Sequence, residues 1–503
     1  MHRILNIASN ENNNEDLVEQ PKADCIFITS VKADINILSE LISNNKFGPI
    51  KDNIRAIHLS YLQKPAQIDH YIDKTVKYAK IVILRIFGDK GTWSYGIERI
   101  QNWAYNDKSK KLIVLSGTDD QDISLNELSN INLEISIKLS KLLREGGKVN
   151  YKKFLNCLDL FLENKNEIPS KYLKVKCYPD PYLYDWKEEN GIKIGIISYK
   201  SLFLANETKL NNELNKELRR SGFSPKTIFV SSLKNIRIHE KILNIVKNEN
   251  IKIILTTTSF DSSINSYTNN ENINLNLFEK IKLPVFQILT SSISKKLWYG
   301  STIGLNSLDL LMQVIMPEFD GRITTVPLAF KETKSINKNL CCEITNYQVN
   351  LFGIKWLTRL VKNYAKLSSL KNKDKKVCLV ISNYPIKNSR IGNGVGLNTP
   401  NTILNILSWL KEEKYFLSEN NIPKSCNELM AKLIKVRTND PESFNNEPLD
   451  YISIESYLEY WNKFPKISKN KVLKRWGSPE FSKDLEKNGF SINGIIFGNV
   501  CIL

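Results

Sequence analysis

Histidine is scarce in this sequence, and cysteine does not occur in the patterns that bind metals. The chain of 503 residues contains four histidines, and none belongs to an H-x-x-x-H pair or lies at ligand spacing from a cysteine. The eight cysteines include no C-x-x-C pair, which favours free thiols in a reducing cytoplasm. We therefore predict no metal site. The histidines are His2, His58, His70 and His239.

Three of these histidines lie in patterns that have simpler interpretations than a metal ligand. His58 falls within an apolar run, so we expect it in a core or at a sheet edge. His70 lies on the polar side of a predicted helix beside Asp73 and Lys74, and His239 begins another helix. We expect both of these side chains to face water.

Long apolar runs are also missing. No run approaches the roughly 18 apolar residues of a membrane-spanning helix, and the start, MHRILNIASNENNNEDL, turns polar too early for a signal peptide. We therefore expect a cytoplasmic protein without a membrane span. The motifs G-x-x-x-x-G-K-[ST] and G-x-S-x-G are absent too, which argues against a P-loop and a hydrolase nucleophile elbow.

Charge of one sign is in excess, because the formal net charge is +18. Lysine and asparagine are abundant throughout, as in KSINKNL and SSLKNKDKK, and no arginine-rich block or aromatic–basic array stands out. A general Lys/Asn bias explains this pattern better than a nucleic-acid groove, so we expect no nucleic-acid partner. The charge would suit a substrate that carries several carboxylates.

Strand-like and helix-like segments alternate along the chain. Apolar, β-branched runs predict parallel strands at 24–29, 81–86, 192–197, 252–257 and 377–381. Helical periodicity separates them, which predicts an α/β protein of consecutive Rossmann-like or flavodoxin-like, doubly wound parallel-sheet units. We expect domains at 1–175, 186–335 and 336–503. The last would begin with one or two amphipathic helices over 344–370.

The stretch NYPIKNSRIGNGVGLNTP, residues 383–400, follows one of these strands and precedes a helix-like run. Its G-x-G-x-G pattern lies about ten residues after the strand, which does not fit the dinucleotide-binding fingerprint. Thr399 before Pro400 is a good helix start. We predict that the loop binds a large anionic or amide-bearing ligand, although a connecting turn is the alternative. The predicted ligand-binding residues are Asn383, Arg390, Gly392, Asn393, Gly394, Gly396 and Thr399.

A second candidate is MPEFDGRI, which contains Asp320 and Arg322. A local Asp–Arg pair at a helix stop is one interpretation. The other is a loop that lines the substrate cleft.

Several phrases resemble a known family in that family's order. NYPIKNSRIGNGVGLNTP, MPEFDGRI, LPVFQILTSS, and WGSPE followed by IIFGNV are similar to the large CobN-type subunit of aerobic cobaltochelatase. LQKPAQIDHYIDKTVKYAKIVILRIFG with WSYGIERI resembles the N-terminal region of the same family. The large subunit of magnesium chelatase ranks second, because it carries a different glycine phrase in this loop.

This resemblance implies a task. The family binds a tetrapyrrole, hydrogenobyrinic acid a,c-diamide, into which cobalt(II) is inserted as the substrate metal. An AAA+ ATPase and a second small subunit are the implied partners, and they supply ATP hydrolysis. Family members are more than twice as long, so we expect this chain to be an N-terminal part, truncated at its C-terminus and inactive alone. Its catalytic residues stay unassigned. A two-Rossmann nucleotide-sugar glycosyltransferase and a non-enzymatic binding protein are the alternatives.

Overall fold

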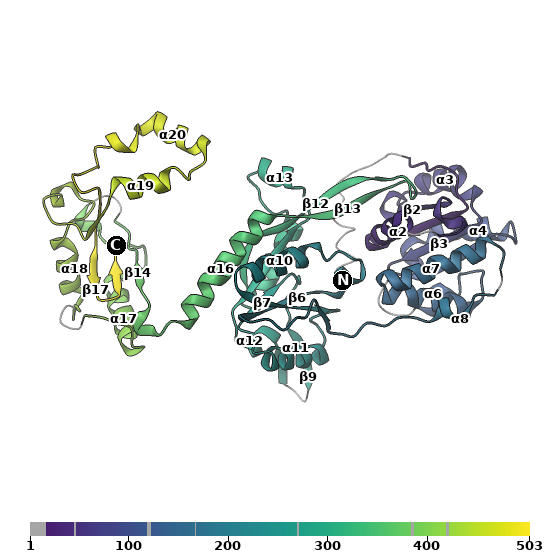
Figure 1. Cartoon of the computed structure of the whole chain (residues 1–503), viewed down its shortest axis with the longest axis horizontal. Coiled ribbons are helices and arrows are strands. Elements are labelled where there is room, and N and C mark those ends of the chain that lie inside the picture. The colour runs from purple at the N-terminus through teal and green to yellow at the C-terminus, as the bar shows by residue number, and fades with distance from the viewer. Residues whose placement is uncertain are drawn as a thin grey trace. The chain divides into compact units, whose positions relative to one another are not determined.

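The computed structural model describes residues 17–44, 47–117, 122–165, 167–268, 271–383, 387–418 and 422–503. The chain divides into two compact units, Met1–Lys362 and Asn363–Leu503 (Figure 1). The finer division into domains at 1–175, 186–335 and 336–503 stays a prediction. No helix in the described part of the chain combines the length and the apolar character that a bilayer crossing requires.

The first sheet of unit 1 has four parallel strands in the order β2-β1-β3-β4. Along β1, Cys25 and Phe27 belong to one buried cluster, whereas Ile26 and Ile28 belong to another on the opposite face. Since both faces are covered, these strands are continuous apolar runs, which is why the sequence reveals them. The strands are β1 (Cys25–Thr29), β2 (Ile54–His58), β3 (Ile81–Ile86) and β4 (Lys111–Ser116).

Helices cover both faces of this sheet. Residues of α2 (Lys32–Asn44), α6 (Leu133–Glu145) and α7 (Gly147–Leu162) pack in the first cluster. Residues of α3 (Pro65–Lys74) and α4 (Ser94–Tyr105) pack in the second. The short helices α5 (Ile123–Asn126) and α8 (Ser170–Leu173) complete this part of unit 1.

The second sheet of unit 1 has seven strands in the order β13-β12-β11-β8-β6-β7-β5. The five inner strands pair in parallel, and the outer strands β13 and β5 are antiparallel to their neighbours. The strands are β5 (Tyr182–Tyr184), β6 (Ile192–Tyr199), β7 (Phe223–Val230), β8 (Ile253–Thr256), β11 (Val285–Ser291), β12 (Ile323–Asn337) and β13 (Cys342–Val349).

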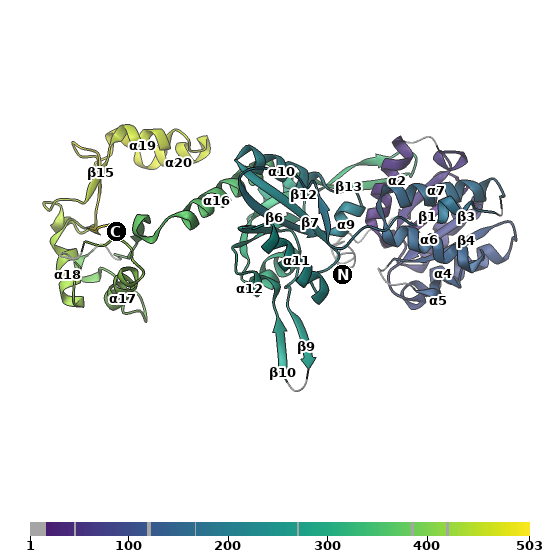
Figure 2. The same ribbon diagram turned by 60° about the horizontal axis from the view of Figure 1, so that its bottom comes forward.

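The connections of the second sheet are mostly helical. A separate hairpin of β9 (Ile264–Thr268) and β10 (Glu271–Leu275) follows β8 and extends away from the sheet, as Figure 2 shows. The helices are α9 (Lys200–Leu204), α10 (Lys209–Arg220), α11 (Ile236–Asn248), α12 (Leu277–Ile281), α13 (Lys295–Gly300), α14 (Ser307–Leu310) and α15 (Met316–Glu318). A π-helical turn, Leu311–Ile315, joins α14 to α15.

Helix α16 (Leu351–Ser369) runs from unit 1 into unit 2. Unit 2 contains a three-stranded sheet in the order β14-β18-β17, in which β14 and β18 are parallel, and a small pair of β15 and β16. Its strands are β14 (Val377–Leu379), β15 (Asp450–Ile452), β16 (Phe490–Ile492), β17 (Ile495–Phe497) and β18 (Val500–Ile502). Its helices are α17 (Thr399–Glu412), α18 (Cys426–Lys435), α19 (Ile454–Trp461) and α20 (Lys466–Trp476).

The predicted α/β class is confirmed, and each of the five predicted strand segments contains a strand with a parallel neighbour. The helix predicted from residue 344 is wrong in its first part. Residues 344–349 belong to β13, which pairs with β12 in a long antiparallel hairpin. Helix α16 begins only after Asn350, whose side chain donates to the Pro327 carbonyl oxygen at 2.9 Å.

Candidate functional site: a pocket at the strand ends and a glycine-rich loop

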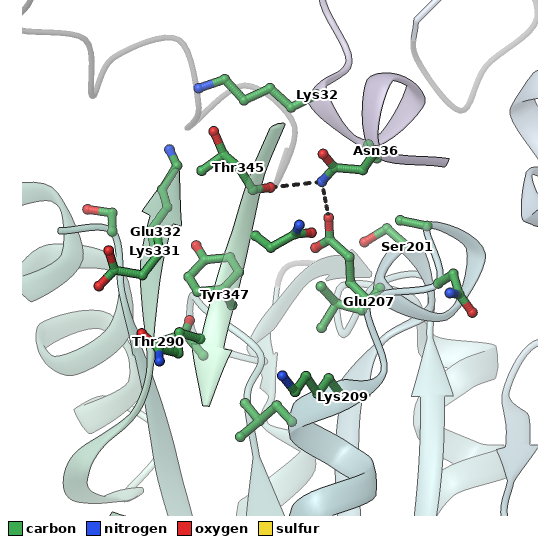
Figure 3. A pocket seen from close by; sticks show the side chains of 18 of the residues that line it. Lys32, Asn36, Ser201, Glu207, Lys209, Thr290, Lys331, Glu332, Thr345 and Tyr347 are labelled. Carbon is green, nitrogen blue, oxygen red and sulfur yellow. Dashed lines mark hydrogen bonds between the residues drawn. The ribbon is translucent and has the colours of Figure 1, made fainter. Parts of the chain in front are cut away.

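Unit 1 contains a pocket of about 810 Å³ (Figure 3), within the range of ligand pockets in proteins. Its wall combines the start of α2, the segments after β6, β8 and β11, the start of α10, the turn after α14, and the hairpin β12–β13. Apolar side chains such as Leu202, Leu308 and Met312 alternate with lysines, carboxylates and amides. The pocket could therefore hold an organic molecule with charged groups.

The strand order explains why a pocket forms here. The chain leaves β6 toward β7 on one side and leaves β8 toward β11 on the other. Connections that depart in opposite directions open a crevice at the carboxyl ends of the two strands, where open α/β sheets bind ligands. Ser201, which follows β6, and Thr257 and Ser259, which follow β8, line the pocket.

A small polar network joins three elements of the pocket wall: α2, β13 and the loop before α10. The side-chain amide of Asn36, on α2, donates to Glu207 Oε1 at 2.7 Å and to the Thr345 carbonyl oxygen at 3.0 Å. Burial raises the pKa of the Glu207 carboxyl, an effect that the hydrogen bond from Asn36 partly offsets. This network holds α2 against β13 and the loop before α10.

Lys32 and Lys331 bring two amino groups to the same part of the wall (Figure 3). Burial and the positive charge of Lys331 lower the pKa of Lys32 to about 8. Lys32 is the first residue of α2, and Lys331 lies on β12. Two amino groups in these positions make the electrostatic potential of this part of the pocket wall positive.

The π-helical turn forms a further part of the pocket wall, next to the end of β11. Gln313 accepts from the Thr290 backbone N–H at 2.8 Å and donates to the Thr290 carbonyl oxygen at 2.9 Å, so its side chain pairs with the end of β11. Asp309 accepts from the Ser292 N–H at 2.7 Å and from Gln313 at 3.0 Å. These bonds fix the carboxyl end of β11 against the turn.

The structure places the glycine-rich loop in unit 2, with its candidate ligand-binding groups at different depths. Arg390, Asn393, Gly394 and Gly396 are exposed, whereas Gly392 is buried. Asn383 and Thr399 are half-buried, and Asn383 forms an isolated bridge with Ile391. The loop carries exposed amide and guanidinium groups beside the start of α17, so it offers donors to an anionic or amide-bearing ligand.

Contacts outside the loop hold its shape. The Asn388 N–H donates to Asp440 Oδ2 at 2.8 Å, and Thr438 donates to Asn388 Oδ1 at 2.7 Å. The Gly392 N–H donates to the Ser382 carbonyl oxygen at 2.7 Å. The cap of α17 differs from prediction by one residue. Asn398 accepts from the Asn401 N–H, and Thr399 is already the first helical residue.

The backbone conformation requires glycine at some of the three glycine positions of the loop but not at all of them. Gly392 and Gly396 adopt φ angles of +70° and +75°, which side chains disfavour. Gly394 does not have a positive φ, and a Cβ there would meet its nearest neighbour, Leu397, at 3.5 Å, an ordinary contact distance. The local backbone therefore accounts for two of the three glycines and leaves Gly394 available for a role in binding.

Asp320 and Arg322 lie in a buried ion pair of unit 1, 8% and 3% exposed, with 2.5 Å between Asp320 Oδ2 and Arg322 Nη2. Asp320 accepts from the Ser262 N–H at 2.7 Å. Arg322 donates to the Thr258 and Phe260 carbonyl oxygens, each at 2.7 Å, so the pair joins β12 to the segment after β8. The substrate-binding role predicted for these two residues stays a prediction.

Each of the three histidines that the structure describes has its own contacts. His58 is buried at the end of β2, as expected, and His70 lies 2.9 Å from Glu19. The prediction for His239 is wrong, because this side chain is 2% exposed and its Nε2 lies 2.6 Å from the Leu233 carbonyl oxygen. His2 lies outside the described residues. Among the residues that the structure does describe, no three His, Cys, Asp or Glu side chains gather in a metal-binding group.

Comparison with known proteins places this fold in a family. Residues 140–503 match the family model described as CobN/Magnesium Chelatase, which is more than half of the chain. The chain belongs to this family. Its glycine-rich loop and part of its pocket wall lie within the matched residues.

Two relatives within the family align over nearly the whole chain. The aerobic cobaltochelatase subunit CobN of Pseudomonas aeruginosa is 28% identical over 89% of this chain and 36% of its own length. The same subunit of a Sinorhizobium species is 26% identical over 96% of this chain and 38% of its own length. The chain therefore spans little more than a third of these relatives. A rice magnesium-chelatase subunit ChlH is 22% identical over 41% of this chain.

A solved structure shares the fold. The catalytic subunit of cobaltochelatase from Mycobacterium tuberculosis superposes with a TM-score of 0.67 and 21% identity, over 96% of this chain and 38% of that one. The fold of this chain is thus that of a segment of a larger protein of known structure.

The pocket itself was not predicted from the sequence. Its wall is assembled from residues between Val31 and Gln348, and no motif links them. The available signal was the strand order of an α/β protein, which predicts a crevice only once the direction of each connection is known.

Proposed function

We propose that this chain is the N-terminal part of the large, tetrapyrrole-binding subunit of a cobaltochelatase. The proposed reaction is ATP-dependent insertion of cobalt(II) into hydrogenobyrinic acid a,c-diamide, in cobalamin biosynthesis. One observation carries the proposal: two cobaltochelatase subunits align over 89% and 96% of the chain, whereas the magnesium-chelatase relative from rice aligns over 41%. The proposed partners are an AAA+ ATPase, which hydrolyses ATP, and a second small chelatase subunit.

The glycine-rich loop is the proposed contact with the tetrapyrrole. A flat ring with peripheral carboxylates and amides needs donors at its edge and backbone that can approach it closely. Arg390 and Asn393 are exposed and supply such donors, and Gly394 carries no Cβ. The start of α17 adds the positive end of a helix dipole. Asn383, Gly392, Gly396 and Thr399 would shape this surface.

Titration of the 503-residue protein with hydrogenobyrinic acid a,c-diamide tests the proposal through the absorption spectrum of the ring. Arg390→Ala is expected to lower the affinity about tenfold or more, since a charge-assisted hydrogen bond contributes roughly 1.5–3 kcal/mol and 1.4 kcal/mol is a factor of ten. The melting temperature should barely change, because Arg390 is exposed.

Arg475→Ala is the matched control, because it removes the same charge from α20, also in unit 2. It should leave the affinity unchanged. Equal affinities for Arg390→Ala and wild type would contradict the role of the loop. Binding of a nucleotide sugar, without a spectral response to the tetrapyrrole, would instead favour the glycosyltransferase alternative.

A further inference from the structure

Lys32 and Lys331 both line the pocket (Figure 3), and the positive charge of Lys331 lowers the pKa of Lys32, after burial, which is the largest cause. Both side chains are half-buried, and among the described residues neither has a salt bridge or hydrogen bond to a carboxylate. Two neighbouring cations in a partly desolvated site are unfavourable unless a negative charge joins them. An anion between them would remove this cost.

The carboxylates of the pocket are occupied elsewhere. Asp309 accepts from the Ser292 N–H at 2.7 Å, and Glu332 accepts from the Lys295 N–H at 2.8 Å. Glu40 is paired with Lys148 at 2.6 Å. Glu207 accepts from Asn36 at 2.7 Å; burial raises its pKa, and the charge of Lys331 lowers it less than the hydrogen bond from Asn36 does. Glu343 does not line the pocket. Its charge changes the pKa of Lys32 less than the charge of Lys331 does.

The surroundings of the two lysines also suit an anion. Lys32 begins α2, a helix of 13 residues, so the positive end of the helix dipole lies at the same place. The apolar wall at Leu202, Ala205 and Met312 would contact the uncharged part of a ligand. A volume of about 810 Å³ admits a molecule much larger than inorganic phosphate.

We propose that this pocket binds a small organic polyanion, whose phosphate or clustered carboxylate groups lie between Lys32 and Lys331. The site is formed by residues of unit 1, whereas the loop proposed to contact the tetrapyrrole lies in unit 2. The two proposals therefore rest on different residues and can fail separately.

Thermal unfolding and calorimetric titration of the whole 503-residue protein test this inference with two probes, citrate for carboxylates and pyrophosphate for phosphates. Wild type is expected to bind at least one probe and to melt at a higher temperature in its presence. Lys32→Met and Lys331→Met keep the length and apolar stem of each side chain but remove its charge. Each should weaken binding about tenfold or more.

The same variants should respond in the opposite way without a ligand. Because each removes a repulsion between cations, the free protein should melt at the same temperature as wild type or higher. If either lysine had only a structural role, its replacement by methionine would lower the melting temperature. Lys331→Arg should keep binding within a few-fold. Lys138→Met, at a partly exposed site on α6 outside the pocket wall, removes the same charge and should leave binding unchanged.

Three results would overturn the inference. They are the absence of binding of either probe to wild type, equal loss of binding in Lys138→Met, and undiminished binding in both methionine variants. If only hydrogenobyrinic acid a,c-diamide binds, and the methionine variants weaken it, the pocket belongs to the tetrapyrrole site and the small-anion proposal is wrong. Should Lys331→Met fail to fold, the comparison of Lys331→Gln with Lys331→Arg decides the matter in its place.

Discussion

At the scale of single residues, His58 shows how packing fixes a protonation state. Its Nδ1 accepts from the Ser60 N–H at 3.2 Å, and its Nε2 lies 3.2 Å from the Ser30 carbonyl oxygen, to which it donates. Protonation of Nδ1, which would give the ring its second proton, would therefore break the hydrogen bond from the Ser60 N–H. Burial, and to a lesser degree the charges of Lys32 and Lys331, lower the pKa of His58 to about 4.

This lowered pKa predicts a pH dependence of stability. In the unfolded chain a histidine titrates near pH 6.5, so between about pH 6.5 and pH 4 the unfolded state binds a proton that the folded state does not. The free energy of unfolding should therefore decrease as the pH falls through this window. His58→Asn keeps an acceptor near the position of Nδ1 and cannot titrate, so its stability should decrease less.

Urea unfolding at several pH values between 4 and 7 measures the free energy of unfolding of wild type and of His58→Asn. The decisive quantity is the difference between the two curves, because other groups titrate equally in both proteins. Curves that stay parallel across the window would show that His58 titrates normally and that its burial does not exclude the proton.

At the scale of the element, the glycine-rich loop separates backbone requirements from binding requirements. Gly392→Ala forces a side chain onto a φ of +70° beside Thr399 and should lower the free energy of unfolding by about 1 kcal/mol or more. Gly394→Ala meets no such strain and should leave stability unchanged. If the ring lies against the loop, Gly394→Ala should nevertheless weaken tetrapyrrole binding, because a methyl group would separate the ring from the backbone.

Chemical denaturation and the spectroscopic titration together measure this contrast. The expected pattern is a stable Gly394→Ala protein with reduced affinity and a destabilised Gly392→Ala protein. Unchanged affinity in Gly394→Ala would mean that the loop does not approach the ring closely.

The elements that could be predicted from sequence are those whose burial pattern is local. Strands β1 and β3 are buried on both faces, and their residues 25–29 and 81–86 stand out as apolar runs. Strand β13 is half-exposed along its length and directly precedes the apolar pattern of α16, so the sequence pattern predicts a helix for both. His239 was misplaced for a related reason. Its burial depends on a tertiary contact with the Leu233 carbonyl oxygen.

The candidate sites divide in the same way. The glycine-rich loop is a continuous segment with an unusual composition, so the sequence identifies it. The pocket depends on Lys32 and Lys331, which lie almost 300 positions apart and meet only because β12 extends across to α2. No periodicity or spacing in the sequence could indicate that meeting.

At the scale of the whole molecule, the extent of the chain bears on the chemistry it can perform. Cobalt insertion requires that the metal sheds water, that the ring bends, and that the pyrrolic protons leave, which calls for metal ligands and a general base. The chain spans 36% and 38% of two cobaltochelatase relatives and 38% of the solved catalytic subunit. Most of the length of these proteins therefore has no counterpart in this sequence.

We accordingly predict that the purified 503-residue protein binds the tetrapyrrole but inserts no cobalt, even with ATP and the two smaller subunits. Formation of the cobalt product can be followed by its absorption spectrum, with the complete Pseudomonas aeruginosa subunit and its partners as the positive control. Binding without turnover is the expected result, because we propose that Arg390 and its neighbours hold the ring and that the groups that deliver the metal belong to the part of the relatives that this chain does not cover. Measurable turnover by this chain would refute the prediction and would place the metal-delivering groups among its own residues. Their identity could then be sought by substituting its buried carboxylates and histidines one at a time.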